Sequence, residues 1–211
     1  MTSSSSPVAP PAAAGPSSRR DALIEAALEM FSRDGYRAVG IDALLKQAGV
    51  AKMTLYKHFR SKEELIAVVL DQRSAAIAAA IAARVKAVPA EDPQAPRLRL
   101  LAVFAWLQDW LQDPGFEGCL FIKAAGEYAD EDELPRQAAL RFKDACRKLL
   151  EELCGGLDCG DPIGLARQLE LLMEGAAVVG FMRRDPTAAV AASEGAALLI
   201  DAAERAPAST L

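Results

Sequence analysis

Apolar residues recur along this chain with the spacing of an α-helix. The first stripe occupies positions i, i+3, i+4, i+7 and i+8, which share one helix face: Leu23, Ala26, Ala27, Met30 and Phe31. Ser17 or Ser18 can cap the start of this helix, and Gly35 can end it because glycine tolerates a left-handed backbone. No segment alternates polar and apolar residues with a period of two, so we expect no strand.

Helix-breaking and capping residues divide the rest of the chain into eight more helical segments. Two are short, at 40–48 and 52–59. Ser61 and Glu64 have the spacing of a capping box, which predicts a long helix that Pro89 stops. The later segments begin near Arg97, span 117–129 and 134–153, begin at Asp161-Pro162, and span 188–205. The sequence therefore predicts an all-α fold of about nine helices.

The N-terminal segment, residues 1–18, is rich in Ser, Pro and Ala and carries no charge. This composition predicts a disordered tail. The tail lacks the apolar stretch of a secretory signal. No apolar run reaches about 18 residues, so we expect no membrane-spanning helix and a cytoplasmic protein.

Charge is distributed unevenly. Residues 1–65 carry nine Lys or Arg and seven Asp or Glu, a net charge of +2, whereas residues 66–211 carry 15 and 22, a net charge of −7. Between 43 and 62 there are five basic residues and no acidic one. A solvated basic surface and a local nucleic-acid contact are both compatible with this basic stretch.

The basic stretch coincides with two short helices joined at Gly49, which is the layout of a helix-turn-helix. Apolar residues of both helices would face inward, namely Ile41, Leu44, Leu45, Val50 and Leu55. The second helix would then expose the residues that this motif presents to the major groove: Lys52, Met53, Thr54, Tyr56 and Lys57. Lys and Thr can bond to base edges, Met can meet a thymine methyl, and Tyr and Lys can bond to phosphates.

Residues 48–65, AGVAKMTLYKHFRSKEEL, resemble the signature of TetR-family transcriptional regulators. The close likeness covers residues 19–66. It implies a DNA-binding domain at 19–65 and a helical effector-binding and dimerisation domain at 66–211. The implied partner is double-stranded DNA with a near-palindromic operator. The candidate DNA contacts are Arg37, Gly40, Lys52, Met53, Thr54, Tyr56, Lys57, His58 and Lys62.

Two positions depart from the family pattern, and one residue has two possible roles. Gly40 replaces a Ser or Thr that commonly caps the second helix, so a hydroxyl contact to phosphate is missing. Leu45 replaces a small residue at the helix crossing. The resemblance implies that His58, with Phe59, packs the recognition helix against the long fourth helix, and a phosphate contact of His58 is the alternative.

Aromatic and polar residues of the C-terminal half are candidates for an effector pocket. Pockets are mostly apolar with a few polar groups, and ordinary core packing is the alternative for each aromatic residue. The candidates are Trp106, Trp110, Phe116, Cys119, Lys123, Glu127, Tyr128, Phe142 and Glu174. They identify no ligand, and we expect no metal site and no cofactor.

The last two helical segments are rich in Gly and Ala, which lets helices approach closely. The resemblance implies that these two helices form the homodimer interface, while close packing inside one subunit is the alternative. An enzyme is not expected, because the only histidine is His58 and there is no catalytic motif. The expected function is a repressor released by a small, largely apolar ligand. An effector-independent regulator, an activator and a redox-responsive regulator that uses Cys119 or the Cys154–Cys159 pair are the alternatives.

Overall fold

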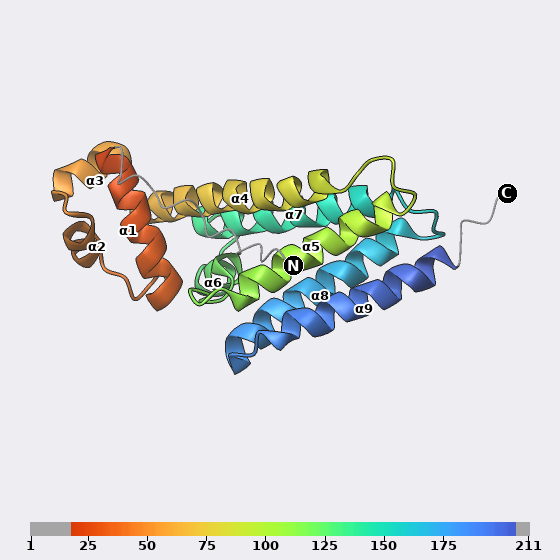
Figure 1. The fold of residues 1–211 in the computed structure, drawn as a ribbon. Coiled ribbons are helices and arrows are strands. Elements are labelled where there is room, and N and C mark those ends of the chain that lie inside the picture. Colours follow the sequence, from red (N-terminus) through yellow and green to blue (C-terminus); the bar gives the residue numbers. More distant parts are fainter. Residues whose placement is uncertain (1–17, 206–211) are drawn as a thin grey trace, which may run out of the picture.

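The computed structural model describes residues 18–205. Over this range the chain forms nine helices and no strand, which confirms the predicted all-α fold. The predicted tail at 1–18 lies almost entirely outside the described residues. Figure 1 shows the helices in chain order: α1 (Arg19–Asp34), α2 (Ile41–Ala48), α3 (Lys52–His58), α4 (Lys62–Ala87), α5 (Ala95–Gln112), α6 (Leu120–Glu127), α7 (Leu134–Cys154), α8 (Pro162–Arg183) and α9 (Thr187–Glu204).

Helices α1 to α3 form a small head at one end of the molecule (Figure 1). The side chain of Ser18 accepts a hydrogen bond from the Asp21 amide and so caps α1, and Gly35 ends α1 at φ +79°. The centre of the head is apolar, with Phe31, Leu44 and Phe59 all buried. These side chains belong to one apolar core that continues from the head into the body.

Helix α4 connects the head to the rest of the molecule. Its 26 residues correspond to about 39 Å of helix. The Ser61 side chain caps it by accepting from the Glu64 amide, while the Glu64 carboxylate accepts from the Arg60 amide. By length and composition α4 could cross a membrane, but its buried residues pack against α1, α5 and α7, as in the core helix of a soluble protein.

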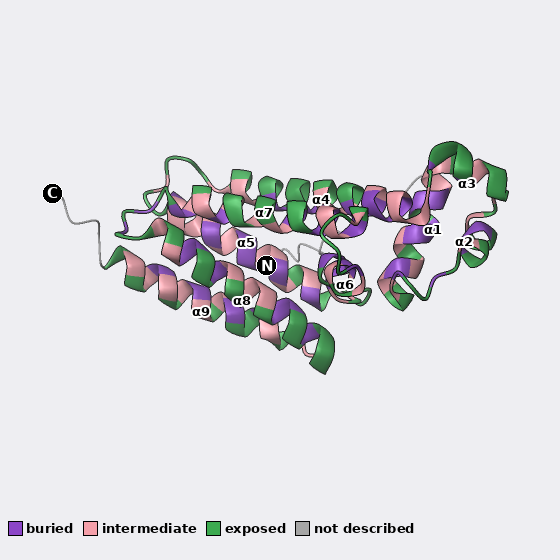
Figure 2. Ribbon diagram, turned by 180° about the vertical axis from the view of Figure 1, so that it is seen from behind, coloured by how far each residue is buried: buried purple, intermediate pink, exposed green. Residues whose placement is uncertain are grey.

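The body consists of α4, α5 and α7 to α9, with the short α6 between the body and the head (Figures 1 and 2). Figure 2 shows that the buried surfaces of these helices face one another and that their exposed surfaces face outward. Helices α8 and α9 lie side by side and pack on α5. The body thus buries one continuous apolar core beneath the head.

The predicted helix ends agree with the structure to within about two residues, except at α6. This helix starts at Leu120, whereas the sequence predicted a start at Glu117. Gly118 has φ +85°, and a side chain there would lie 2.9 Å from the ring of Phe181. A backbone in this left-handed conformation cannot continue a helix, so the segment from 117 to 119 approaches α6 as a loop.

Candidate functional site

The recognition helix α3 exposes the face that the sequence predicted. Lys52, Met53, Tyr56 and Lys57 are exposed, with Met53 at 80%, while Leu55 is buried. Thr54 is half-buried. Within the described residues the side chains of Lys52, Tyr56 and Lys57 have no hydrogen-bond or ion-pair partner, so their donors are available to an external ligand. Contact of this face with DNA remains a prediction.

The packing role expected of His58 is wrong. His58 is exposed, and only Phe59 enters the core. The reason is local: α3 ends at His58, and the extended backbone of Phe59 (φ −139°, ψ 130°) turns its ring inward. Gly40 is exposed and caps α2 without a side-chain bond, as its lack of a hydroxyl requires. A phosphate contact of His58 remains a prediction.

Two other predicted DNA contacts have partners within the chain. The Arg37 guanidinium donates to the carbonyl oxygen of Glu127 at 2.7 Å and lies over the ring of Tyr128. The Lys62 ammonium donates to the Tyr36 carbonyl oxygen at 2.6 Å, and burial lowers the pKa of Lys62. Both side chains therefore help to hold the segment after α1 in place, and their contact with DNA remains a prediction.

Helix α6 is the main polar contact between body and head. The Glu127 carboxylate accepts hydrogen bonds from the backbone amides of Tyr36 (2.9 and 3.1 Å) and Arg37 (2.6 Å). The Lys123 ammonium donates to the Ser32 carbonyl oxygen at 2.6 Å. Tyr128 is buried, with its ring against that of Tyr36 at 6.1 Å.

Three predicted ligand-binding residues are therefore corrected. Lys123, Glu127 and Tyr128 do not line the cavity of the body. Lys123 bonds to the Ser32 carbonyl oxygen, Glu127 bonds to the backbone amides after α1, and Tyr128 packs against the ring of Tyr36. They couple α6 to the head instead. Phe116 also lies outside the cavity wall and packs edge-on against Trp110, with ring centres 4.9 Å apart.

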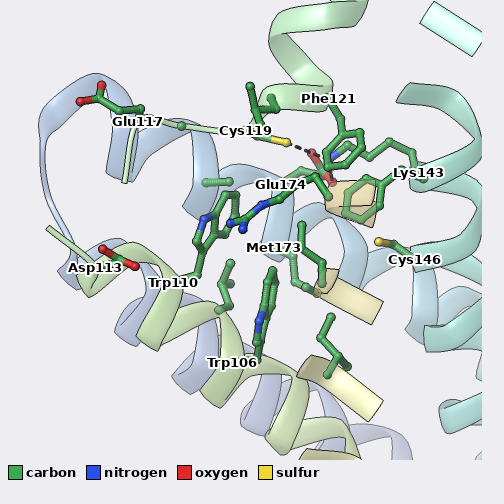
Figure 3. A pocket seen from close by; sticks show the side chains of 18 of the residues that line it. Trp106, Trp110, Asp113, Glu117, Cys119, Phe121, Lys143, Cys146, Met173 and Glu174 are labelled. Carbon is green, nitrogen blue, oxygen red and sulfur yellow. Dashed lines mark hydrogen bonds and ion pairs between the residues drawn. The ribbon is translucent and has the colours of Figure 1, made fainter. Parts of the chain in front are cut away.

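The body contains a cavity of about 250 Å³ that also reaches the head. Figure 3 shows Trp106 and Trp110 on one side, and Phe121, Lys143 and Cys146 on the other. Leu28 and Ser32 of α1 contribute to the same wall, so the cavity touches the DNA-binding domain directly. The predicted residues that do line it are Trp106, Trp110, Cys119, Phe142 and Glu174.

Stacked aromatic rings make up much of the cavity wall. The rings of Trp106 and Trp110 are stacked with centres 5.5 Å apart and planes at 18°. The rings of Phe121 and Phe142 are stacked with centres 3.7 Å apart. These flat apolar surfaces can contact an aromatic or compact aliphatic ligand over a large area.

Two cations in the cavity were missed by sequence reasoning. Lys143 donates to the Glu174 carboxylate at 2.5 Å and approaches the Cys119 sulfur at 3.7 Å (Figure 3). Burial alone would lower the pKa of Lys143, but Cys119 and Glu174 raise it above its ordinary value. Arg73 of α4 also lines the wall. Its spacing from Ile77 and Ile81, at i+4 and i+8, is the signal that places it on the inner face of α4.

The cysteines are free thiols, and three of them have unfavourable surroundings for a thiolate. Burial raises the pKa of Cys146 to about 11 and that of Cys154 to about 12, and burial also raises the pKa of Cys159. The fourth, Cys119, has a cation beside it: the Lys143 ammonium lies 3.7 Å from its sulfur.

A second cavity, more open and about 720 Å³ in volume, lies between α4 and α7. It shares Ile77, Ile81, Phe142 and Cys146 with the first cavity. Arg99 and Lys86 line its other side. The rest of its described wall is mostly aliphatic, and Phe142 is the only aromatic ring in it.

Helices α8 and α9 expose large apolar side chains. Leu171 is 70% exposed, Met182 76% and Leu198 68%. Of the small residues that suggested an interface, Gly180 and Ala192 are buried inside the subunit, whereas Gly175 and Ala191 are exposed. A side chain at Gly180 would lie 2.7 Å from Leu111. The buried glycines and alanines thus serve close packing within one chain, and an interface role of the exposed ones remains a prediction.

The sequence of the head matches known proteins. Residues 23–69 match the family model of bacterial regulatory proteins of the tetR family. A curated relative, the transcriptional activator FasR of Mycolicibacterium smegmatis, is 48% identical over 54 residues, which is 26% of this chain and 25% of the relative. The transcriptional repressor KstR2 of the same organism is 38% identical over 63 residues, 30% of this chain and 31% of the relative. The chain thus matches about a quarter to a third of the length of these two curated relatives.

Solved structures extend the likeness to the body. A TetR transcriptional regulator of Streptomyces avermitilis is 34% identical, with a TM-score of 0.76, and the match covers 89% of this chain and 98% of that one. A TetR-family regulator of Streptomyces coelicolor is 29% identical with a TM-score of 0.82, and the match covers 88% and 96%. The head and the body both share the arrangement of these two proteins.

Proposed function

The chain belongs to the TetR family of transcriptional regulators, and we propose that it represses its target genes as a homodimer until a small, largely apolar ligand fills the body cavity. The observation that carries this proposal is the composition of the cavity wall. Leu28 and Ser32 of the DNA-binding head line the same space as Trp106 and Trp110 of the body. A bound ligand would therefore contact both domains at once.

The contacts of α6 give the ligand a route to the head. Cys119, Leu120 and Phe121 line the cavity at the start of α6, and Lys123 and Glu127 of the same helix bond to the end of α1. A ligand that favours one position of α6 also favours one position of the head. It shifts operator affinity only by the difference between its own affinities for the two positions.

The exposed apolar faces of α8 and α9 support a homodimer. A monomeric soluble protein rarely exposes a contiguous apolar patch of large side chains, and Leu171, Met182 and Leu198 are each more than two-thirds exposed. Pairing of two copies through α8 and α9 would cover them. Two heads would then meet two half-sites about one helical turn apart, roughly 34–36 Å.

The DNA-binding part of the proposal is tested with a duplex selected from a random library by the purified protein. Fluorescence anisotropy then compares the wild type with Lys52→Ala/Tyr56→Ala. We expect the double variant to lose most of its affinity, because both side chains lie on the exposed face of α3. Lys148→Ala, an exposed charge on α7, is the matched control and keeps wild-type affinity. Unchanged binding by the double variant would refute the assignment.

The ligand and repressor parts need two further measurements. Compounds that raise the unfolding temperature should also release the selected duplex, since a ligand at 100 times its Kd adds about 2.7 kcal/mol to the stability of the state it binds. Deletion of the gene should raise transcription from promoters that contain the selected site. A fall in transcription would make the protein an activator, as FasR is named, rather than a repressor, as KstR2 is named.

A further inference from the structure

Arg73 stands out among the charged residues of the aromatic cavity. It is half-buried on α4, and among the residues that the structure describes it has no hydrogen-bond or ion-pair partner. Burial lowers the pKa of the guanidinium, and electrostatic interactions with Asp113 and, to a lesser extent, Cys119 oppose this shift. A charge withdrawn from water without a partner is costly to keep.

The acidic residues of the same cavity do not form an ion pair with Arg73. Glu174 is paired with Lys143 at 2.5 Å, and Glu170 is paired with Arg147 at 2.9 Å. Asp113 and Glu117 are exposed at the rim, and Asp113 already accepts from the Gly115 amide. Figure 3 shows Asp113 and Glu117 at one edge, away from Lys143 and Glu174. The unpaired charge inside the cavity is thus positive.

The chemistry of Arg73 narrows the class of ligand. A guanidinium binds a carboxylate through two parallel N–H···O bonds, and these charge-assisted bonds are among the strongest in proteins. A dianion such as a phosphate monoester would bring a second negative charge beside Asp113 and Glu117, and the described residues of the cavity wall offer no second unpaired cation to match it. A monoanion fits the charge of the site.

We propose that the aromatic cavity binds a compact apolar monocarboxylate, with its carboxylate on Arg73 and its apolar body against Trp106 and Trp110. This inference rests on the proposed effector function of the same cavity. The volume of about 250 Å³ favours a one-ring or similarly small body. The positive charge of Arg73 disfavours amines, which the tryptophan rings alone would accept.

Three probes of nearly equal shape test the proposal: 4-tert-butylbenzoate, its neutral amide, and 4-tert-butylbenzylamine. The chain has two tryptophans, and both line the cavity, so tryptophan fluorescence reports on this site alone. Titration calorimetry without DNA provides the affinities. We expect the acid to bind at least about tenfold more tightly than the amide, equivalent to about 1.4 kcal/mol, and the amine to bind most weakly.

Variants assign the preference to Arg73. Arg73→Gln should remove the preference for the acid and leave the affinity of the amide unchanged. Arg73→Lys should keep part of the preference for the acid, since the charge remains but the bidentate geometry is lost. Arg99→Gln, which removes a cation from the second cavity, is the matched control and should bind like the wild type. Thermal unfolding without ligand shows that each variant is folded.

Three results would overturn the proposal: no detectable binding of the acid, equal binding of acid and amide, or an acid preference that survives in Arg73→Gln. The proposed effector function fails separately. Acid that binds through Arg73 but does not release the selected duplex would refute the effector function and keep the ligand class. Release of the duplex by the amine or amide alone would refute the ligand class and keep the effector function.

Discussion

Replacement of Glu127 by alanine should loosen the head from the body. The Glu127 carboxylate accepts from two backbone amides, those of Tyr36 and Arg37, at 2.6–3.1 Å. A hydrogen bond to a charged group contributes about 1.5–3 kcal/mol. Because Glu127 is half-buried and water can partly replace it, we take the lower value for each bond and expect a loss of about 3 kcal/mol.

Two measurements check this value. Chemical denaturation gives the free energy of unfolding, and amide hydrogen exchange of Tyr36 and Arg37 gives the local opening of the contact. Glu131→Ala, an exposed acid beyond the end of α6, is the control and should change stability by less than about 0.5 kcal/mol. If Glu127→Ala unfolded like the control and its two amides exchanged at wild-type rates, the carboxylate would not hold the head.

We expect four further outcomes. Lys57→Ala should weaken binding to every duplex to a similar extent and lower the salt slope by about 1, as measured by anisotropy at several salt concentrations. Leu171→Glu and Leu198→Glu should convert dimers into monomers in sedimentation, because each puts a charge on the exposed apolar face. Gly180→Leu should lower the free energy of unfolding of the subunit, measured by chemical denaturation, by about 1–3 kcal/mol or more, since its side chain would collide with Leu111. Peroxide at sub-millimolar doses should leave DNA binding intact, because burial holds the pKa of Cys154 at about 12 and thus keeps it a thiol at neutral pH. Peroxide release that vanished when all four cysteines were replaced by serine would instead support a redox switch.

Local sequence signals predicted most of the helices because the residues that start and stop them act on their own neighbours. Ser18, Ser61 and Asp161 each cap the helix that the sequence assigned to them. The start of α6 escaped prediction because its cause is remote. Gly118 takes a left-handed conformation where its backbone passes the ring of Phe181, more than 60 residues away in the chain.

The recognition face was predictable and the cavity was predictable only in part. Residues of α3 are either buried or exposed according to helical spacing, so Lys52 and Tyr56 could be identified from the pattern. In the body, two lysines of similar sequence setting have different partners: Lys143 lies in the cavity and Lys123 bonds to the head. Only the packing of α6 against α1 and α7 distinguishes them, and the spacing along one helix does not contain that information.

The length of α4 has a mechanical consequence. Arg73 lies eleven residues from Lys62, where α4 begins, so the cavity contacts this helix about 16 Å from the head. A tilt of about 10° at Arg73 would move the start of the helix by about 3 Å, close to the rise of one base pair along a duplex. If α4 tilted in this way as a rigid helix, a small shift at the cavity would move the head by about one base pair along the operator.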